Sequence, residues 1–142
     1  MRIGIIGRPN TGKSTLINNI IEQKRLVTGV QAGITRDSIE VLWNYKNEQV
    51  SIIDTAGLRK KSKVINILEK DMVNDTLRTI KFSDICILLI DVSKSIDKQD
   101  LNIARMIIGE GRGLIIGANM WDKIIDKNLI KEEIFYQLKS SL

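Results

Sequence analysis

The stretch Gly7-Arg8-Pro9-Asn10-Thr11-Gly12-Lys13-Ser14 matches the pattern G-x-x-x-x-G-K-[ST]. An apolar run at 2–6 precedes it and predicts a strand, and an amphipathic run at 13–23 follows it and predicts a helix. Glycines let such a loop wrap around a phosphate chain, so that successive backbone N–H groups point at the oxygens. The positive end of the helix dipole faces the same anion. The stretch therefore predicts an α/β fold with a phosphate-binding loop after its first strand.

The residue types in this loop suit different parts of a nucleotide. Lys13 would place its charge between the β- and γ-phosphates, and Ser14 would offer a hydroxyl to Mg²⁺. A chance loop that ends in a capping lysine is the alternative. The predicted nucleotide contacts in this part of the chain are Gly7, Arg8, Pro9, Asn10, Thr11, Gly12, Lys13, Ser14 and Thr15.

A second candidate site follows the apolar run 50–53. The carboxylate of Asp54 could hold Mg²⁺ through a water molecule, and the backbone N–H of Gly57 could reach a γ-phosphate because no side chain blocks it. An Asp-led turn at the end of a strand would explain the same pattern. The predicted nucleotide contacts here are Asp54, Thr55, Ala56 and Gly57.

A third candidate site follows the apolar run 114–118 and predicts a choice of base. A carboxylate at Asp122 could accept hydrogen bonds from N1–H and the 2-amino group of guanine. Adenine offers neither donor and would leave that carboxylate unpaired. An Asx-type turn after a strand is the alternative. The predicted nucleotide contacts are Asn119, Met120, Trp121 and Asp122, with Asn119 bracing the loop.

Thr35 lies in the polar segment 33–37, between the first helix and the next predicted strand. A hydroxyl in such a loop could bind Mg²⁺ only while a γ-phosphate is present, which is the logic of a nucleotide-gated switch. A surface threonine before a strand is the plain alternative. We predict Mg²⁺ ligation by Ser14 and Thr35, with Asp54 acting through water.

Apolar runs alternate with amphipathic ones along the rest of the chain, which predicts a mostly parallel sheet with helices on both faces. We expect a three-layer sandwich with one antiparallel strand, contributed by a hairpin over 38–54. The segment 28–37 is interpreted as a long loop. Phe135 is expected to point inward from the last helix. The further predicted strands are 38–45, 48–54, 85–92 and 114–118, and the further helices are 65–80, 97–108 and 128–142.

Composition bounds the chemistry of this chain. Its 142 residues allow one ordinary domain, and a net charge of +5 favours polyanionic partners. The sequence contains no histidine and a single cysteine, Cys86, which excludes a Ser-His-Asp triad, an internal disulfide and a zinc cage. Cys86 lies in an apolar run and is expected to be buried and inert. No run is long enough for a membrane helix or a signal peptide, so we expect a cytoplasmic protein without membrane insertion.

The motifs occur in the order expected of a GTPase, at Lys13, Thr35, Asp54 and Asp122. Over residues 2–123 the chain resembles translation-factor-type P-loop GTPases, and specifically the second GTPase domain of the Der (EngA) family of bacterial ribosome-assembly GTPases. The resemblance implies binding of GTP and GDP, Mg²⁺ as cofactor, and a switch function in large ribosomal subunit assembly. Partners would be that subunit and its RNA, contacted through further domains of the family, one of them KH-like.

The resemblance also implies catalytic roles. We expect Lys13, Thr35, Gly57 and Asn10 to serve the attack of water on the γ-phosphate of GTP. Leu58 occupies the position at which many small GTPases carry a water-orienting glutamine. Family members have an asparagine like Asn10 that helps hold a potassium ion against the phosphates, so Asn10 is a candidate K⁺ ligand; an asparagine that merely shapes the loop is the alternative.

Two features of the chain depart from the family pattern, and a third has two possible roles. Met120 replaces a lysine whose charge ties the base loop to the phosphate loop, which predicts weaker binding with guanine preference retained. The family's last strand and helix do not follow residue 142, so we expect one C-terminally incomplete GTPase domain over 1–142, with an uncovered edge at 114–118. A basic run at 59–63 is either a solvated loop or a contact to ribosomal RNA or to the KH-like domain of the family.

Two other functions remain open from the sequence alone. A nucleotide-binding or interaction fragment of a longer GTPase that does not hydrolyse GTP is the main alternative, and Met120 and Leu58 favour it. An adenine-specific ATPase is the second alternative, and Asp122 argues against it.

Overall fold

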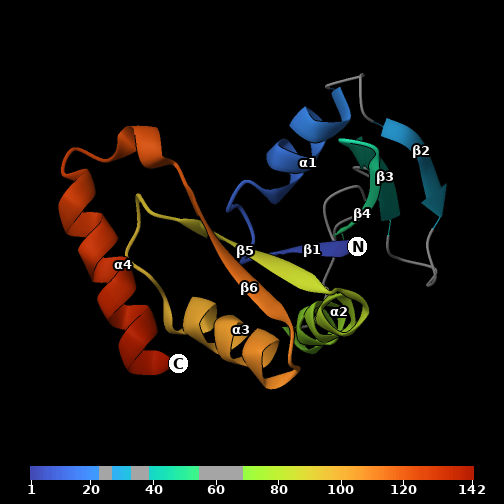
Figure 1. Cartoon of the computed structure of the whole chain (residues 1–142). Helices are drawn as coiled ribbons and strands as arrows, with labels where there is room; N and C mark the ends of the chain where they lie inside the picture. The colour runs from blue at the N-terminus through green and yellow to red at the C-terminus, as the bar shows by residue number, and fades with distance from the viewer. Residues whose placement is uncertain (23–26, 33–38, 55–68) are drawn as a thin grey trace.

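The computed structural model describes residues 1–22, 27–32, 39–54 and 69–142, which form a sheet with helices packed around it (Figure 1). The strands are β1 (Arg2–Ile6), β2 (Val27–Ala32), β3 (Ile39–Tyr45), β4 (Glu48–Asp54), β5 (Ile85–Asp91) and β6 (Gly113–Asn119). The helices are α1 (Lys13–Glu22), α2 (Glu69–Phe82), α3 (Lys98–Gly109), the short 3₁₀ helix η1 (Trp121–Lys123) and α4 (Lys127–Ser141).

The six strands form one sheet in the order β2-β3-β4-β1-β5-β6. Strand β1 pairs in parallel with β4 on one side and with β5 on the other, and β6 pairs in parallel with β5. Among the described strands, β3 alone runs opposite to the other five, since it is antiparallel to both β2 and β4. Because β1, β4, β5 and β6 run the same way, the loops after them open at one edge of the sheet.

The alternation of side chains along β1 divides the apolar interior into two clusters. Ile6 packs with residues of α2 and α3, whereas Ile5 packs with Ile17 of α1. Helices α2 and α3 therefore cover one face of the sheet and α1 covers the other, which confirms the three-layer α/β architecture (Figure 1). Cys86 is buried in the first of these clusters, and burial raises the pKa of its thiol.

Two expectations about secondary structure and packing are wrong. Part of the segment expected to be a loop forms β2, which pairs with β3 in an antiparallel ladder. The two glycines and mixed polarity of the segment favour a loop. Its β-branched residues and the backbone hydrogen bonds that β3 supplies favour a strand instead. Phe135 is 64% exposed, since α4 packs inward through Ile130 and Ile134, and Phe135 lies about 100° around the helix from Ile134.

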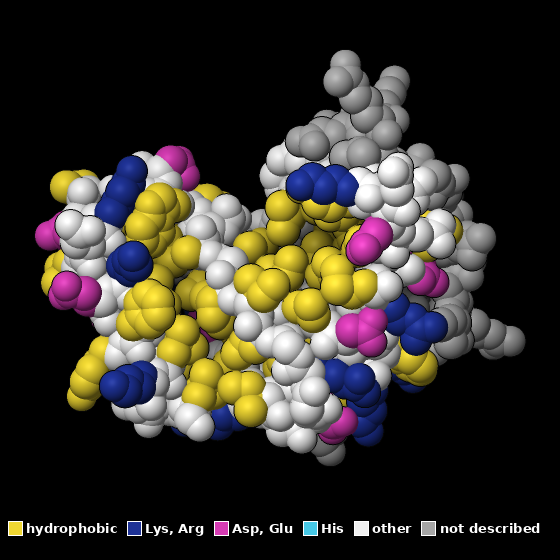
Figure 2. Space-filling model, in the orientation of Figure 1, with side chains coloured by type: hydrophobic (Ala, Val, Ile, Leu, Met, Phe, Trp, Pro, Cys, Tyr) yellow, Lys and Arg dark blue, Asp and Glu magenta, His cyan; other side chains and the backbone are white. Residues whose placement is uncertain are grey.

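Strand β6 ends the sheet, as expected, and its two faces differ. Leu114 and Ile116 pack against the cluster shared with α3, whereas Ile115 points to the opposite face and is 50% exposed. Hydrophobic side chains gather over β5 and β6 on the face seen in Figure 2. In the described part of the chain, no helix has the length and apolar character needed to cross a membrane.

Candidate nucleotide-binding site

The phosphate loop connects the carboxyl end of β1 to the start of α1, as the motif predicts (Figure 1). The backbone N–H of Leu16 donates to the Gly12 carbonyl at 3.0 Å and begins the helix. Asn10 and Gly12 have positive φ angles of 64° and 96°. Asparagine and glycine are the residues that tolerate this left-handed region best, so the sequence is suited to the sharp path of the loop.

The Lys13 side chain folds back over the loop from which it arises. Its Nζ atom donates to the carbonyl oxygen of Gly7 at 2.8 Å and to that of Arg8 at 2.6 Å. These bonds hold an ammonium group at the mouth of a loop whose helix N-terminus already favours anions. The arrangement provides a positive charge where the sequence predicts the phosphate chain.

The phosphate loop is joined directly to the loop that is predicted to choose the base. Asn119 Nδ2 donates to the Thr11 carbonyl oxygen at 2.8 Å, across 108 positions of sequence. Thr11 is 3% exposed, and its hydroxyl donates to the Arg8 carbonyl at 2.9 Å. A β-carbon added at Gly12 would collide with Asn119 Nδ2, so glycine at this position allows the close approach. The predicted bracing role of Asn119 thus has a defined partner.

The base loop turns sharply after β6. Met120 adopts the left-handed conformation, with φ 61° and ψ 28°, and the N–H of Lys123 closes the turn on the Met120 carbonyl at 3.0 Å. Trp121 packs against the core cluster shared with α3, while Asp122 is exposed in η1. The turn therefore anchors one side chain in the core and presents a carboxylate at the surface.

The other predicted contacts fall into two groups. Ser14 and Thr15 are exposed at the start of α1, and Asp54 ends β4 in register with Ile5 of β1. Thr35, Thr55, Ala56 and Gly57 lie outside the described residues, as do Leu58 and the basic run, so the roles assigned to them stay predictions.

The donors available for a metal suit magnesium. Among the described residues, no cluster of three or more histidine, cysteine, aspartate or glutamate side chains could enclose a metal ion. Mg²⁺ keeps several waters and is bound by one or two protein oxygens together with substrate phosphates. The Ser14 hydroxyl is an oxygen donor of the kind that Mg²⁺ accepts, and the metal-binding roles of Ser14 and Asp54 stay predictions.

Asp91 ends β5 beside the base loop, in register with Asn119. The Ser93 hydroxyl donates to Asp91 Oδ1, the Ser93 backbone N–H donates to the same oxygen at 3.0 Å, and Lys94 Nζ lies 3.7 Å from the other. These partners, above all the Ser93 hydroxyl, hold the pKa of Asp91 below its ordinary value, although burial acts in the opposite direction. Asp91 is therefore a fixed negative charge that stiffens this turn.

A missed residue, Asp100, is the partner of Arg8. The Arg8 guanidinium turns toward the first turn of α3, where its Nε donates to Asp100 Oδ1 at 2.9 Å. Asp100 is 2% exposed, and the sequence predicts only that it lies in the helix over 97–108. The spacing of Asp97 and Asp100 could have indicated a helix cap, but no sequence signal linked either residue to Arg8.

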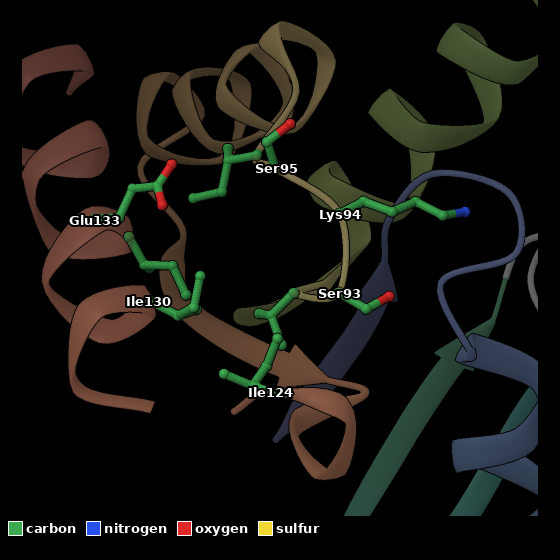
Figure 3. A pocket seen from close by; sticks show the side chains of 9 residues that line it. Ser93, Lys94, Ser95, Ile124, Ile130 and Glu133 are labelled. Atoms are coloured by element: carbon green, nitrogen blue, oxygen red, sulfur yellow. The ribbon is translucent and has the colours of Figure 1, made fainter. Parts of the chain in front are cut away.

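A cavity of about 200 Å³ lies between α4 and the loop after β5 (Figure 3). Ile124 and Ile130 point toward it, whereas Lys94 points away (Figure 3). None of the predicted nucleotide contacts that the structure describes lines this cavity. Its mainly apolar walls make it a separate feature from the phosphate site.

Comparison with known proteins gives concordant results. A family model described as 50S ribosome-binding GTPase matches residues 2–120. GTPase Der of Rickettsia prowazekii (strain Madrid E) is 50% identical over all of this chain, which spans 32% of that relative.

Two solved structures of Era are also similar. Era from Aquifex aeolicus, bound to GDP.AlF4-, has a TM-score of 0.71 at 28% identity, covering 98% of this chain and 46% of its own. Era in complex with MgGDPNP and a segment of 16S ribosomal RNA has a TM-score of 0.68 at 27% identity, with the same coverage. The family model matches residues 2–120, which is most of this chain, and the chain therefore belongs to the family of 50S ribosome-binding GTPases.

Proposed function

We propose that residues 1–142 form one GTPase domain that binds GTP and GDP with Mg²⁺ and hydrolyses GTP. The observation that carries this proposal is the Lys13 ammonium group, held on the Gly7 and Arg8 carbonyls within a loop that Asn119 ties to the base loop. These contacts support a phosphate site at this loop, and they tie it to the end of the strand that precedes Asp122.

The reaction is the attack of water on the γ-phosphate. Lys13 and the N–H groups of the phosphate loop bind the phosphate oxygens and stabilise the negative charge as it spreads over them. Ser14 and Thr35 would hold Mg²⁺, with Asp54 acting through water, and the cation would neutralise charge on the β- and γ-phosphates. The N–H of Gly57 would fix the γ-phosphate.

Calorimetric titration of the purified chain with Mg–GDP and Mg–GTP tests binding. We expect saturable binding, weakened roughly a hundredfold by Lys13→Ala because hydrogen bonds to a charged group are lost. ATP should compete poorly, because adenine leaves the Asp122 carboxylate unpaired. A folded wild-type chain that binds neither guanine nucleotide would overturn the proposal.

Release of phosphate from GTP separates turnover from binding alone. Wild-type turnover that disappears in Lys13→Ala would support hydrolysis. Binding without turnover would favour the hydrolysis-deficient alternative, which the replacement of the base-loop lysine by Met120 also favours.

Asn10 supports a role for a monovalent cation. It holds a left-handed position at the exposed tip of the phosphate loop, where its amide oxygen can contribute to a K⁺ site. Turnover should be faster in KCl than in NaCl at equal ionic strength, and Asn10→Ala should remove the difference. Equal rates in the two salts would exclude this role.

The cellular role that we propose is a nucleotide switch in assembly of the large ribosomal subunit, which places the protein in the cytoplasm. The family description and the complex of Era with ribosomal RNA support it. The basic residues Arg59, Lys60, Lys61 and Lys63 would contact RNA phosphates. Co-sedimentation with large subunits should depend on nucleotide and weaken as salt increases; association independent of salt would contradict a phosphate contact.

A further inference from the structure

The side chain of Arg8 leaves the phosphate loop and contacts helix α3. Its Nε atom donates to Asp100 Oδ1 at 2.9 Å, and its Nη2 atom lies 2.9 Å from Asp100 Oδ2. This is a two-point contact between a guanidinium and a carboxylate, the most directional ion pair that side chains form. The Asp100 side chain is 2% exposed and that of Arg8 is 21% exposed, so water competes little for the contact.

The carboxylate end of this pair is itself fixed. Asp100 Oδ2 also accepts the backbone N–H of Asp97 at 3.1 Å, which completes a capping box at the start of α3. Asp97 in turn accepts the Gln99 N–H at 2.8 Å. Asp100 is therefore held by the first turn of a helix that packs against β5 and β6 and cannot easily follow Arg8 if the loop shifts.

The backbone end of the pair is the part of the loop that holds the lysine. The Arg8 carbonyl oxygen accepts from Lys13 Nζ at 2.6 Å and from the Thr11 hydroxyl at 2.9 Å. A change in the position of Arg8 would therefore move the acceptor on which the Lys13 ammonium rests. The contact runs from α3 through Asp100 and Arg8 to Lys13.

We propose that Asp100 is a positioning residue for nucleotide binding: through Arg8 it fixes the carbonyl that orients Lys13 toward the phosphates. This inference rests on the proposed function, and it adds a residue 92 positions away from the loop it serves. Small displacements of a charged group in a binding site weaken binding strongly, since the interaction depends on geometry.

The test compares Asp100→Asn with Asp97→Ala in calorimetric titrations with Mg–GDP, with folding checked by urea unfolding. Asp100→Asn keeps an acceptor for the helix cap but removes the charge that binds Arg8, and it should weaken binding by about tenfold. Asp97→Ala removes the cap and only a 3.6 Å contact to Arg8 from a half-exposed side chain. It should lower stability and leave the GDP affinity within about twofold.

Two further measurements keep the result interpretable. Arg8→Gln alone would leave a buried carboxylate unpaired, so the double variant Arg8→Gln/Asp100→Asn replaces both charges with amides. The double variant should bind GDP no more weakly than Asp100→Asn alone, because both substitutions remove the same ion pair. The preference for GTP over ATP should not change, since the Asn119–Thr11 contact is intact.

Hydrogen exchange without nucleotide provides an independent readout, in which Asp100→Asn should speed exchange of the phosphate-loop amides and Asp97→Ala should not. A folded Asp100→Asn chain with wild-type GDP affinity and wild-type exchange would overturn the positioning role while leaving the proposed function standing. A wild-type chain that binds no guanine nucleotide would overturn both.

Discussion

At the scale of single residues, the charged carboxylate of Asp91 stabilises the turn that follows β5. Its folded pKa lies below the ordinary value of 3.8 because the Ser93 hydroxyl stabilises the carboxylate. A group with a lowered folded pKa contributes stability above its unfolded pKa, and this contribution is lost as the pH falls through the folded value. The turn after β5 should therefore be stabilised at neutral pH and weakened in acid.

We predict that Ser93→Ala lowers the free energy of unfolding at pH 7 by about 1 kcal/mol, since a hydrogen bond to a charged acceptor is lost. The difference from wild type should shrink as the pH falls below about 4 towards the lowered folded pKa of Asp91, because the carboxylate is protonated first in the unfolded chain and only at lower pH in the folded protein. Urea unfolding at pH 7 and pH 3 measures this, with Ser95→Ala as control. An equal loss at both pH values would show that the bond does not act through the charge.

Met120 occupies the position at which the Der family, which this chain resembles, carries lysine. Its left-handed φ of 61° already forms the turn, so a side-chain change here need not alter the path of the backbone. We predict that Met120→Lys tightens GDP binding severalfold by adding a positive charge near the phosphate loop, on the order of 1 kcal/mol. Calorimetry at low and high salt checks this, because the gain should fall with screening; unchanged affinity at low salt would contradict it.

The positions of the phosphate loop and the base loop could be predicted from the sequence, because each loop directly follows a strand that the apolar pattern identifies. The pattern that ends in Lys13 fixes a loop between a strand and a helix, and Asn119 follows a strand that can only end at the same rim. Asp100 could not be found in this way. A buried aspartate in a helix cap looks the same in sequence whether or not an arginine from another loop reaches it.

At the scale of elements, α3 illustrates how one helix has an inner and an outer side. Ile107 is fully buried against the strands, whereas its neighbour Ile108 is 47% exposed. We predict that Ile107→Ala lowers the free energy of unfolding by about 3 kcal/mol through lost burial and the cavity left behind. Ile108→Ala is the matched control, with a loss below about 1 kcal/mol. Similar losses in urea unfolding would mean that α3 does not pack as described.

The elements themselves were predictable wherever burial imposed a pattern. The apolar runs that form β1 and β5 identify their strands because both faces of the sheet are covered. Strand β2 was missed because it lies at an edge, where the side-chain pattern is weak and pairing with β3 decides the structure. Phe135 was misplaced because the sequence shows the apolar side chains of α4 but not which of them meets another element.

At the scale of the whole molecule, β6 is the edge of the sheet, and Ile115 is half exposed beside it. Exposed edges with apolar side chains promote pairing between chains. We predict that the chain self-associates with concentration and that Ile115→Lys weakens this association roughly tenfold, about the effect of removing one buried isoleucine. Analytical ultracentrifugation measures it. The control is Ile125→Lys in the fully exposed loop before α4, and equal effects of the two changes would exclude the β6 edge.

The bond between Asn119 and Thr11 spans 108 positions, and this separation determines when the protein can first hold a ligand. A chain made from its N-terminus presents the phosphate loop early, but the strand that positions Asn119 leaves the ribosome only after most of the sheet has been synthesised. Contacts between distant positions form late, since the intervening chain must first be ordered. Stable retention of a guanine nucleotide should therefore mark nascent chains whose synthesis has passed β6.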